Sequence, residues 1–353
     1  MLVYLADLFN WEGLIRTSYF RGFLAFILAL AVSLIFGGKL IEFLRRHQKK
    51  GQPIREDGPK SHLLTKKGTP TMGGFLILGA SIFAMLLFCN LSNVFVWVGI
   101  GVLFIYGAVG FADDYVKVTK QTSNAMTAKM KLLLQFTTAL AAILIISHYT
   151  LTENRYFLNF PYVSWKLYLG WLYIPFAMVV IAGASNGVNL SDGLDGLAGG
   201  LLSIVFVVFM IGAYVAGGVL VLDASVPHIE GAQEVAVMCA AVVGACLGFL
   251  RFNIKPASVF MGDTGSLALG AFLGVIAVIL KQEILLAIAG GVFVMESISV
   301  MIQVGYFKLT KKRFFKMAPI HHHFEQSGWN ENKVVHRFWL LALILAVVAL
   351  LAY

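Results

Sequence analysis

Residues 94–115 read VFVWVGIGVLFIYGAVGFADDY, an apolar run that ends in the adjacent carboxylates Asp113 and Asp114. About twenty apolar residues are the length that an α-helix needs to cross the hydrocarbon core of a bilayer. A carboxylate inside that core costs on the order of 3 kcal/mol, so two acids at the end of such a run either face water or serve a function. The stretch predicts a membrane-spanning helix that ends in an acidic pair.

The whole chain has the composition of an integral membrane protein. Of its 353 residues, 59% are hydrophobic and 13% are charged, whereas soluble domains average roughly 45–50% and 25%. No linker or internal repeat divides the sequence, so we expect a single domain over residues 1–353. The net charge of +9 lies largely in the segments between apolar runs and does not indicate nucleic-acid binding.

Runs long enough to cross about 30 Å of hydrocarbon predict an all-α membrane protein with about ten transmembrane helices. An even number of helices places both termini on the same side. Two connections have a character of their own, because the aromatic-rich segment 152–170 favours an interfacial hairpin and residues 223–234 favour a short surface helix. The expected helices cover about 21–44, 71–90, 94–112, 132–150, 171–188, 197–222, 233–250, 265–280, 284–305 and 338–353.

Lysine and arginine are unevenly divided between the two sets of loops. Most of them follow the first, third, seventh and ninth apolar runs. By the positive-inside rule these loops are cytoplasmic, and both termini lie outside. The opposite side carries only Arg16, Arg21, Arg155, Lys166 and Lys281.

Two further segments place carboxylates at the ends of apolar runs. In residues 185–196, SNGVNLSDGLDG, the polar residues Asn186, Asn189, Asp192 and Asp195 recur at every third position and form a ladder on one side of a helical turn. Contact between helices is the alternative reading of this ladder. In residues 259–266, VFMGDTGS, Asp263 could hold a cation at a helix start that also binds an anion, or it could simply cap the helix. With the orientation above, all three acidic segments lie on the cytoplasmic face.

The last cytoplasmic loop contains MAPIHHHFE at residues 317–325, with three consecutive histidines, His321, His322 and His323. Neighbouring side chains on a helix point about 100° apart, so the three cannot all face one metal ion. Zinc is therefore a poor fit. Contact with phosphate or pyrophosphate suits the cationic surroundings better.

The second run begins in a basic, glycine-rich loop that includes residues 58–62 and KKGTPTMGG at 66–74. Most of its charge is what the positive-inside rule requires of any such loop. Lys66 and Thr71 lie beside glycines, where they could also contact phosphate or a nucleotide.

Carboxylates, lysines and histidines thus gather at one face of the membrane. Magnesium-assisted phosphoryl transfer needs this set of groups, because Mg²⁺ binds one or two carboxylates together with substrate phosphates while cations neutralise the developing charge. A site at the boundary of the membrane implies one soluble and one lipid-borne substrate.

Four motifs occur in order over nearly the whole chain: GFADDY at 110–115, NLSDGLDGLA at 189–198, FMGDTGS at 260–266 and MAPIHHHFE at 317–325. Together they resemble the phospho-N-acetylmuramoyl-pentapeptide transferases of the polyprenyl-phosphate N-acetylhexosamine-1-phosphate transferase superfamily. The resemblance implies transfer of phospho-MurNAc-pentapeptide from UDP-MurNAc-pentapeptide to undecaprenyl phosphate in the bacterial cytoplasmic (inner) membrane, with Mg²⁺ as cofactor. It also implies contact with membrane lipid and a homodimer.

Site residues follow from the same resemblance. Asp113, Asp114 and Asp263 resemble the family's essential acids, with Asp263 as the Mg²⁺ ligand. Lys117 and Lys129 resemble its anion-contacting lysines, and His321 to His323 resemble its histidine motif. The nucleotide-sugar pocket is implied to contain Lys66, Thr71, Asn186, Asn189, Asp192, Asp195, Phe260 and Gln303.

Three questions stay open at this point. Asp113 could attack phosphorus to form a covalent intermediate, or it could prepare the lipid phosphate for direct attack. The second pKa of a phosphate monoester lies near 6, which favours direct attack because the oxyanion is already available at neutral pH. A sister enzyme that transfers N-acetylglucosamine phosphate and an ion-coupled transporter with a midplane acidic site are the other candidate functions.

Overall fold

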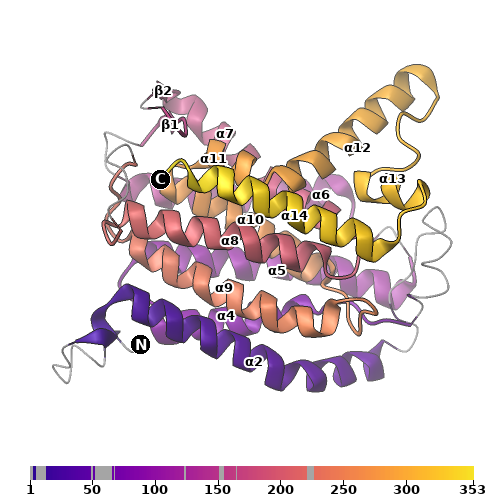
Figure 1. Ribbon diagram of the computed structural model, residues 1–353, viewed down its shortest axis with the longest axis horizontal. Coiled ribbons are helices and arrows are strands. Elements are labelled where there is room, and N and C mark those ends of the chain that lie inside the picture. The colour runs from indigo at the N-terminus through magenta and orange to yellow at the C-terminus, as the bar shows by residue number, and fades with distance from the viewer. Residues whose placement is uncertain are drawn as a thin grey trace.

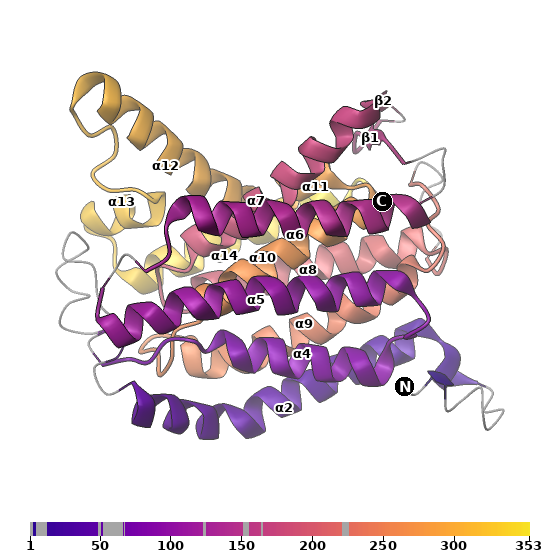
Figure 2. The same cartoon turned by 180° about the vertical axis from the view of Figure 1, so that it is seen from behind.

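The computed structural model of the protein describes residues 3–4, 13–48, 51, 66, 68–122, 125–150, 155–163, 165–220 and 226–353 (Figure 1). Most of these residues are helical, and the longer helices lie side by side in one bundle (Figures 1 and 2). The elements are η1 (Leu14–Arg16), α2 (Ser18–His47), α4 (Gly74–Phe88), α5 (Val94–Lys120), α6 (Ala128–Tyr149), β1 (Phe157–Asn159), β2 (Lys166–Tyr168), η2 (Gly170–Leu172), α7 (Tyr173–Ser191), α8 (Leu197–Ala216), α9 (Ala232–Asn253), α10 (Gly262–Leu280), α11 (Glu283–Ala289), α12 (Gly291–Thr310), α13 (Ile320–Gln326) and α14 (Glu331–Leu350).

Nine helices of the described residues are long and apolar enough to cross a membrane, and the shorter apolar helix α4 lies among them. Each expected run coincides with a helical segment, which confirms a mostly helical, multi-pass membrane protein. Helix α4 has 15 residues and spans about 22 Å, less than a hydrocarbon core of about 30 Å. Large apolar side chains such as Phe104 on α5 and Ile344 on α14 are exposed, as contact with lipid requires.

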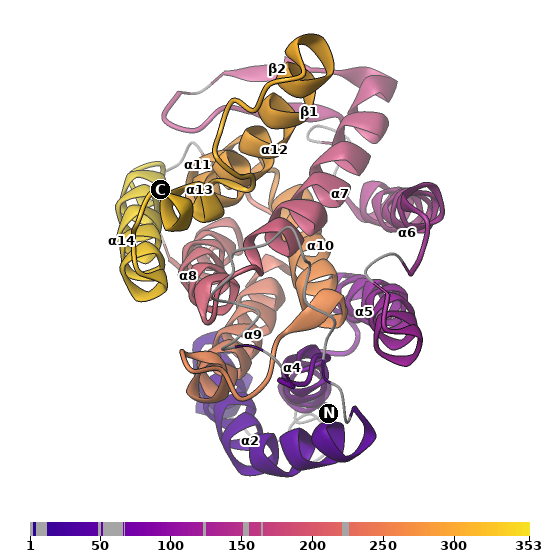
Figure 3. The ribbon, with the colours of Figure 1, turned by 90° about the vertical axis from the view of Figure 1, so that its right-hand side faces the viewer.

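Helix α10 forms the centre of the bundle. Seen end-on it lies between α5, α7 and α8 (Figure 3), and nearly all of its residues are buried. Small residues let membrane helices approach closely. At Gly110 of α5 the approach is so close that an added Cβ would collide with the backbone carbonyl of Asp263 in α10. The contact fixes the acid-bearing segments of α5 and α10 relative to one another.

The ninth expected helix, residues 284–305, is broken in two. It forms α11 and α12, which are separated at Gly290. The adjacent residue Gly291 is also a glycine, and glycine is a poor helix former because of its backbone freedom. Beyond the break, α12 leans away from the bundle, with the short helix α13 beside its far end (Figures 1 and 2).

The two connections singled out from the sequence have different outcomes. Strands β1 and β2 pair antiparallel, with Leu158 opposite Leu167, which confirms the hairpin. The surface helix expected over 223–234 is wrong in its described part, because residues 226–231 are not helical and α9 begins only at Ala232. Pro227 cannot donate a backbone hydrogen bond, and Gly231 has a φ of 81°, so neither favours an earlier helix start. The hairpin, the start of α2 and the end of α14 lie at the end of the bundle opposite α13 (Figure 1).

Candidate functional site

The three acid-bearing segments meet at one end of the bundle. Helix α5 continues past the expected limit of 112 to Lys120, so Asp113 and Asp114 lie within it, while Asp263 lies in the first turn of α10. Asp192 follows α7, and its Oδ2 accepts a hydrogen bond of 3.2 Å from the amide of the glycine before Asp263. We call these four aspartates the acidic cluster.

Asp114 is fully buried and holds the start of α10 in place. Its Oδ1 accepts a hydrogen bond of 3.2 Å from the Asp263 amide. Its Oδ2 accepts from the amide of Thr264 at 3.0 Å and from the Thr264 hydroxyl at 2.8 Å. The first amides of a helix have no partner within the helix and attract negative charge. The Asp114 carboxylate satisfies two of them and thereby positions Asp263.

Asp113 and Asp263 share two lysines. Lys117 Nζ lies 2.7 Å from Asp113 Oδ2 and 3.1 Å from Asp263 Oδ2. Lys131 Nζ lies 3.2 Å and 2.7 Å from the same two oxygens. Asp113 Oδ1 also accepts a hydrogen bond of 2.9 Å from the Met126 amide. Two carboxylate oxygens from different helices therefore converge on a position of concentrated positive charge.

The lysine of α6 that contacts the acidic cluster is Lys131 and not Lys129. Lys129, which the resemblance implies to be an anion-contacting lysine, is exposed near the start of α6. Two residues further along a helix point about 200° around its axis, so the two lysines face opposite directions. The register of α6 is fixed by Thr127, whose hydroxyl accepts a hydrogen bond of 3.3 Å from the Met130 amide. A helix-cap signal at Thr127 was the one feature of the sequence that could have favoured Lys131.

Lys66 is the centre of a second charged group. Its Nζ lies 2.8 Å from Asp195 Oδ1 and 2.7 Å from Glu331 Oε1, and Lys255 Nζ lies 2.7 Å from Glu331 Oε2. Burial alone would lower the pKa of Lys66, but the Asp195 and Glu331 carboxylates outweigh it and raise this pKa above its ordinary value. We call these four residues the Lys66 cluster. Sequence reasoning identified Lys66 and Asp195 but missed Glu331 and Lys255, for which no local pattern exists.

Phe260 lies beside the Lys66 cluster, and Thr71 lies beside the acidic cluster. The Phe260 ring centroid lies 5.8 Å from Lys66 Nζ. An ideal Cβ on Gly262 would lie 2.5 Å from both Thr71 Oγ1 and Asp114 Oδ2, so Thr71 borders the acidic cluster. The buried Thr71 hydroxyl has no hydrogen-bond partner among the described residues. It is therefore a polar group that a ligand could satisfy.

The three histidines have three different environments, as their adjacency on a helix predicts. His321 is fully buried, with Nδ1 3.1 Å from Glu296 Oε2 on α12. Its ring also packs so closely on Gly193 that a Cβ there would collide with it. His322 Nδ1 lies 2.7 Å from Glu325 Oε2, whereas His323 Nδ1 accepts from the Lys316 amide at 3.2 Å. His321 thus contacts the loop after α7, and His323 faces a different segment.

The polar ladder of α7 divides among several partners. Asn189 donates to Asp263 Oδ1 and to Ser266 Oγ, each at 2.8 Å. Asn186 lies one turn earlier and donates to Gln135 Oε1 at 2.8 Å, which is the helix-contact role considered as the alternative. Gln303 on α12 accepts from the Phe315 amide at 2.8 Å, and none of its hydrogen bonds among the described residues reaches either cluster. The structure therefore joins Asn189 to the acidic cluster, but not Asn186 or Gln303.

Asp113 and Asp263 have the donor chemistry that Mg²⁺ prefers, since hard cations bind carboxylate oxygens. Among the described residues, no set of three His, Cys, Asp or Glu side chains is arranged to enclose a metal ion. Magnesium rarely needs such a set, because it binds one or two carboxylates and completes its shell with water and substrate phosphates. The carboxylates of Asp113 and Asp263 fit that mode of binding, although in this structure their Oδ2 atoms are paired with Lys117 and Lys131.

The described residues include only part of the basic loop before α4. Residues 52–65, which include the 58–62 segment, and Lys67 lie outside the described residues. Lys66 and Thr71 are the members of the loop whose contacts bear on the site.

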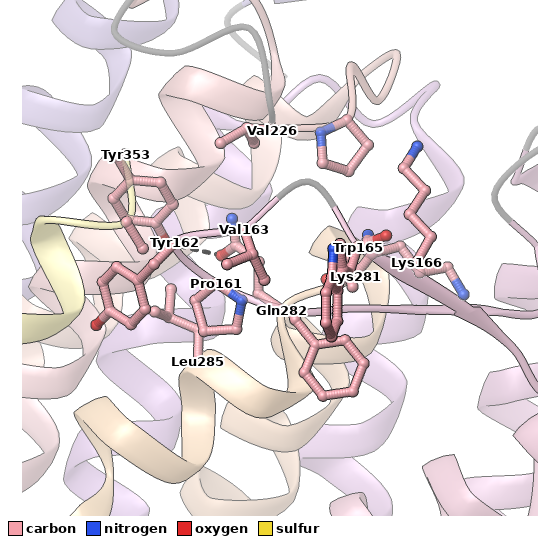
Figure 4. A pocket seen from close by; sticks show the side chains of 14 residues that line it. Pro161, Tyr162, Val163, Trp165, Lys166, Val226, Lys281, Gln282, Leu285 and Tyr353 are labelled. Carbon is pink, nitrogen blue, oxygen red and sulfur yellow. Dashed lines mark hydrogen bonds between the residues drawn. The ribbon is translucent and has the colours of Figure 1, made fainter.

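A cavity of about 280 Å³ lies elsewhere, beside the β1–β2 hairpin at the opposite end of the bundle (Figure 4). Trp165, Lys281 and Tyr353 are among its lining residues, and none of the predicted site residues lines it. Burial lowers the pKa of Lys281 to about 8, and its Nζ donates a hydrogen bond of 2.9 Å to the Arg155 carbonyl. This cavity is separate from both charged clusters.

Comparison with known proteins gives consistent results. Residues 96–281 match the glycosyl transferase family 4. The phospho-N-acetylmuramoyl-pentapeptide-transferase of Bartonella quintana (strain Toulouse) is 46% identical over 355 residues, which covers 99% of this chain and 98% of that protein. The protein of the same name from Rickettsia bellii (strain RML369-C) is 49% identical over 334 residues, 94% of this chain and 92% of that protein.

Proposed function

Because the chain belongs to glycosyl transferase family 4 and, within it, to the phospho-N-acetylmuramoyl-pentapeptide transferases, we propose that it transfers phospho-MurNAc-pentapeptide from UDP-MurNAc-pentapeptide to undecaprenyl phosphate. The products are UMP and undecaprenyl-pyrophosphoryl-MurNAc-pentapeptide (lipid I), the first membrane intermediate of peptidoglycan synthesis. The donor is a soluble nucleotide sugar and the acceptor is carried in membrane lipid. A site for both must lie where the bilayer meets water.

One observation carries this proposal: two carboxylates from α5 and α10 converge, with two lysines, at the ends of apolar helices. In the reaction an oxygen of the lipid phosphate bonds to the sugar-linked phosphorus, and the bond from that phosphorus to the UMP oxygen breaks. Such a transfer depends on positioning and on neutralising the phosphate charge. Lys117 and Lys131 supply fixed positive charge for the phosphates, and the two carboxylates hold those lysines in place.

We assign the metal to Asp263 and Asp113. When bound there, Mg²⁺ supplies charge neutralisation and a template for the two phosphates. Asp114 acts one step away, because its hydrogen bonds set the position of Asp263. The negative charge of the carboxylates attracts a divalent cation. The positive charge of Lys117 and Lys131 offsets the repulsion between these carboxylates and the substrate phosphates.

The contacts of Asp113 favour direct attack by the lipid phosphate over a covalent intermediate on Asp113. Its Oδ1 accepts a hydrogen bond from a backbone amide and its Oδ2 contacts two ammonium groups, which reduces its nucleophilicity. The lipid phosphate has a second pKa near 6 and is largely a dianion at neutral pH. Absence of a phospho-muramoyl adduct on Asp113 when the lipid is withheld is the expected result, and a trapped adduct would establish the two-step route.

The Lys66 cluster and the residues beside it are assigned to the uridine nucleotide. Lys66 offers charge and Phe260 an aromatic face, and the Thr71 hydroxyl has no hydrogen-bond partner in the part of the chain that the structure describes. We assign to the same nucleotide subsite Asn189, Asp192 and Asp195. We assign to the phosphates and the sugar His321, His322 and His323. We place Asn186 and Gln303 at the edge of the pocket, because Asn186 contacts Gln135 on α6 and Gln303 contacts Phe315 in the segment between α12 and α13.

The orientation follows from charge. The lysine-rich end of the bundle, which carries α13 and both clusters, is assigned to the cytoplasm, and both termini to the outside of the bacterial inner membrane. Gln326→Cys should then react with an impermeant thiol reagent only after cells are opened, and Leu167→Cys in intact cells. The reverse pattern would contradict this orientation. We further infer that the chain acts as a single domain and associates as a homodimer, which a molar-mass measurement in detergent tests.

The proposed function is tested by UMP release. Purified protein should release UMP from UDP-MurNAc-pentapeptide only with undecaprenyl phosphate and Mg²⁺ present, and chelation of the metal should stop release. UDP-N-acetylglucosamine as the better donor would instead establish the sister activity. An ion-coupled transporter would release no UMP from either donor, and its acidic site would lie mid-span rather than at helix ends.

A further inference from the structure

Glu331 is a buried carboxylate with every oxygen engaged. It is the first residue of α14 and is 5% exposed. Its Oε1 accepts hydrogen bonds from Lys66 Nζ at 2.7 Å and from the Asp195 amide at 3.0 Å. Its Oε2 pairs with Lys255 Nζ at 2.7 Å. One side chain thus joins the segment before α4, the loop between α7 and α8, the segment before α10 and the start of α14.

The surroundings of Glu331 make the ionised form the stable one. A buried charge is costly unless it is paired and hydrogen-bonded. Here two ammonium groups, a backbone amide and the positive end of the α14 dipole all face the carboxylate. Removing the charge leaves Lys66 with Asp195 as its remaining ion-pair partner. Removing both side-chain oxygens, as in Glu331→Met, also deprives the Asp195 amide of its acceptor.

Two parts of the nucleotide side depend on these contacts. Lys66 is held between Glu331 and Asp195, which sets where its ammonium lies relative to Phe260. The loop of Asp195 is held through its own amide, and two residues before Asp195 this loop packs against the ring of His321. Only four residues, 327–330, separate α13 from α14. Glu331 therefore fixes the position of Lys66 and, through the short connection between α13 and α14, the position of the histidine-bearing helix α13.

We propose that Glu331 is a positioning residue for the uridine-nucleotide subsite, acting through Lys66 and Asp195 without touching the substrate. The inference rests on the proposed function, because the subsite is the one assigned above. It gives Glu331 a specific effect on nucleotide affinity, in addition to whatever it contributes to folding.

The first experiment compares Glu331→Gln with Glu234→Gln. Glu234 is a matched control at the other end of the bundle: it also lies in the first turn of a helix, is 3% exposed, and accepts from a cation, Arg21, and from a backbone amide, Asn90. Both variants are expected to lower the melting temperature. We expect Glu331→Gln alone to raise the KM for UDP-MurNAc-pentapeptide and the Kd for UMP about tenfold, with kcat within about threefold of wild type.

The second experiment is a double-mutant cycle with Lys66→Met. If Glu331 acts through Lys66, adding Glu331→Gln to Lys66→Met should change KM by less than about twofold, because the affected contact is already gone. Full multiplication of the two effects would overturn the proposal, as would an unchanged KM in Glu331→Gln or an equal rise in Glu234→Gln. Glu331→Met, which also removes the charge, serves if Glu331→Gln does not fold, and it is held to the same outcomes. A wild-type protein that releases no UMP would reject the proposed function itself, which is a separate result.

Discussion

Replacing Lys131 by methionine removes one of the two ammonium groups that join α5 to α10. Lys131 contacts Asp113 and Asp263 directly, whereas Lys129 is exposed on the opposite side of α6. The pair Lys131→Met and Lys129→Met therefore makes the same chemical change two residues apart on one helix. The difference between them isolates the contact with the acidic cluster.

The size of the effect follows from the contacts of Lys131. Loss of one donor that stabilises transition-state charge costs roughly 2.7–4 kcal/mol, and each 1.36 kcal/mol corresponds to about a tenfold change in rate. The Lys131 side chain is 18% exposed, so water replaces part of the lost interaction. We therefore expect the lower limit, about a 100-fold loss of kcat, for Lys131→Met. For Lys129→Met we expect a change of less than about threefold, as for most exposed charges.

Initial rates of UMP release at saturating Mg²⁺ and saturating substrates measure this difference. Thermal unfolding of each variant checks that Lys131→Met still folds. Equal losses in the two variants, or a larger loss in Lys129→Met, would refute the role given to Lys131 and would support Lys129, which the family resemblance implies to be an anion-contacting lysine.

Three further predictions concern charge and pH. Asp113→Asn should be strongly impaired at neutral pH and should not recover at higher pH when rates are compared across pH, because the lost carboxylate holds the metal and the two lysines. Recovery relative to wild type above about pH 8, roughly two units beyond the phosphate pKa, would instead make Asp113 a base toward the lipid phosphate. Burial and the charges of Asp263 and Asp114 raise the pKa of Asp192 well above its ordinary value, so the ionised form destabilises the fold at neutral pH. Asp192→Asn should therefore raise the melting temperature while lowering activity, and a lower melting temperature would contradict this. Burial lowers the pKa of Lys281 from 10.5 to about 8. Between about pH 8 and pH 10.5 the lysine is therefore mostly protonated in the unfolded chain and mostly neutral in the folded protein. The free energy of unfolding should consequently rise as the pH increases through this range. The rise should be smaller in Lys281→Met, as measured by denaturation at a series of pH values.

The sequence predicts the helices and the meeting of the acidic segments for one reason. Hydrocarbon imposes a minimum length on every apolar run, and carboxylates are excluded from its centre. Asp113 and Asp263 could thus be assigned to one face of the membrane before any contact was known. The break at Gly290 was not predicted, because two glycines within an apolar run are common in membrane helices and do not by themselves end one.

Two features of the site were beyond sequence reasoning. The choice between Lys129 and Lys131 depends on the residue at which α6 begins, and helix starts are the least certain part of any sequence-based prediction. The ion pair of Lys66 with Glu331 joins positions 265 residues apart. Local sequence patterns predict only contacts between residues within one or two helical turns of each other. They therefore cannot predict an ion pair between Lys66 and Glu331. The sequence also singled out Asp114, but nothing in it identified the partner of Asp114, which is the start of α10.

The most direct test of phosphoryl transfer at the acidic cluster is the turnover of Asp263→Asn at saturating Mg²⁺. The amide keeps the shape of the side chain, and asparagine caps a helix about as well as aspartate. A protein that folds like wild type but forms almost no UMP or lipid-linked product is the result we predict. Near-normal turnover in this variant would contradict it, because the Asp263 carboxylate would then not be needed and the metal would have to bind elsewhere.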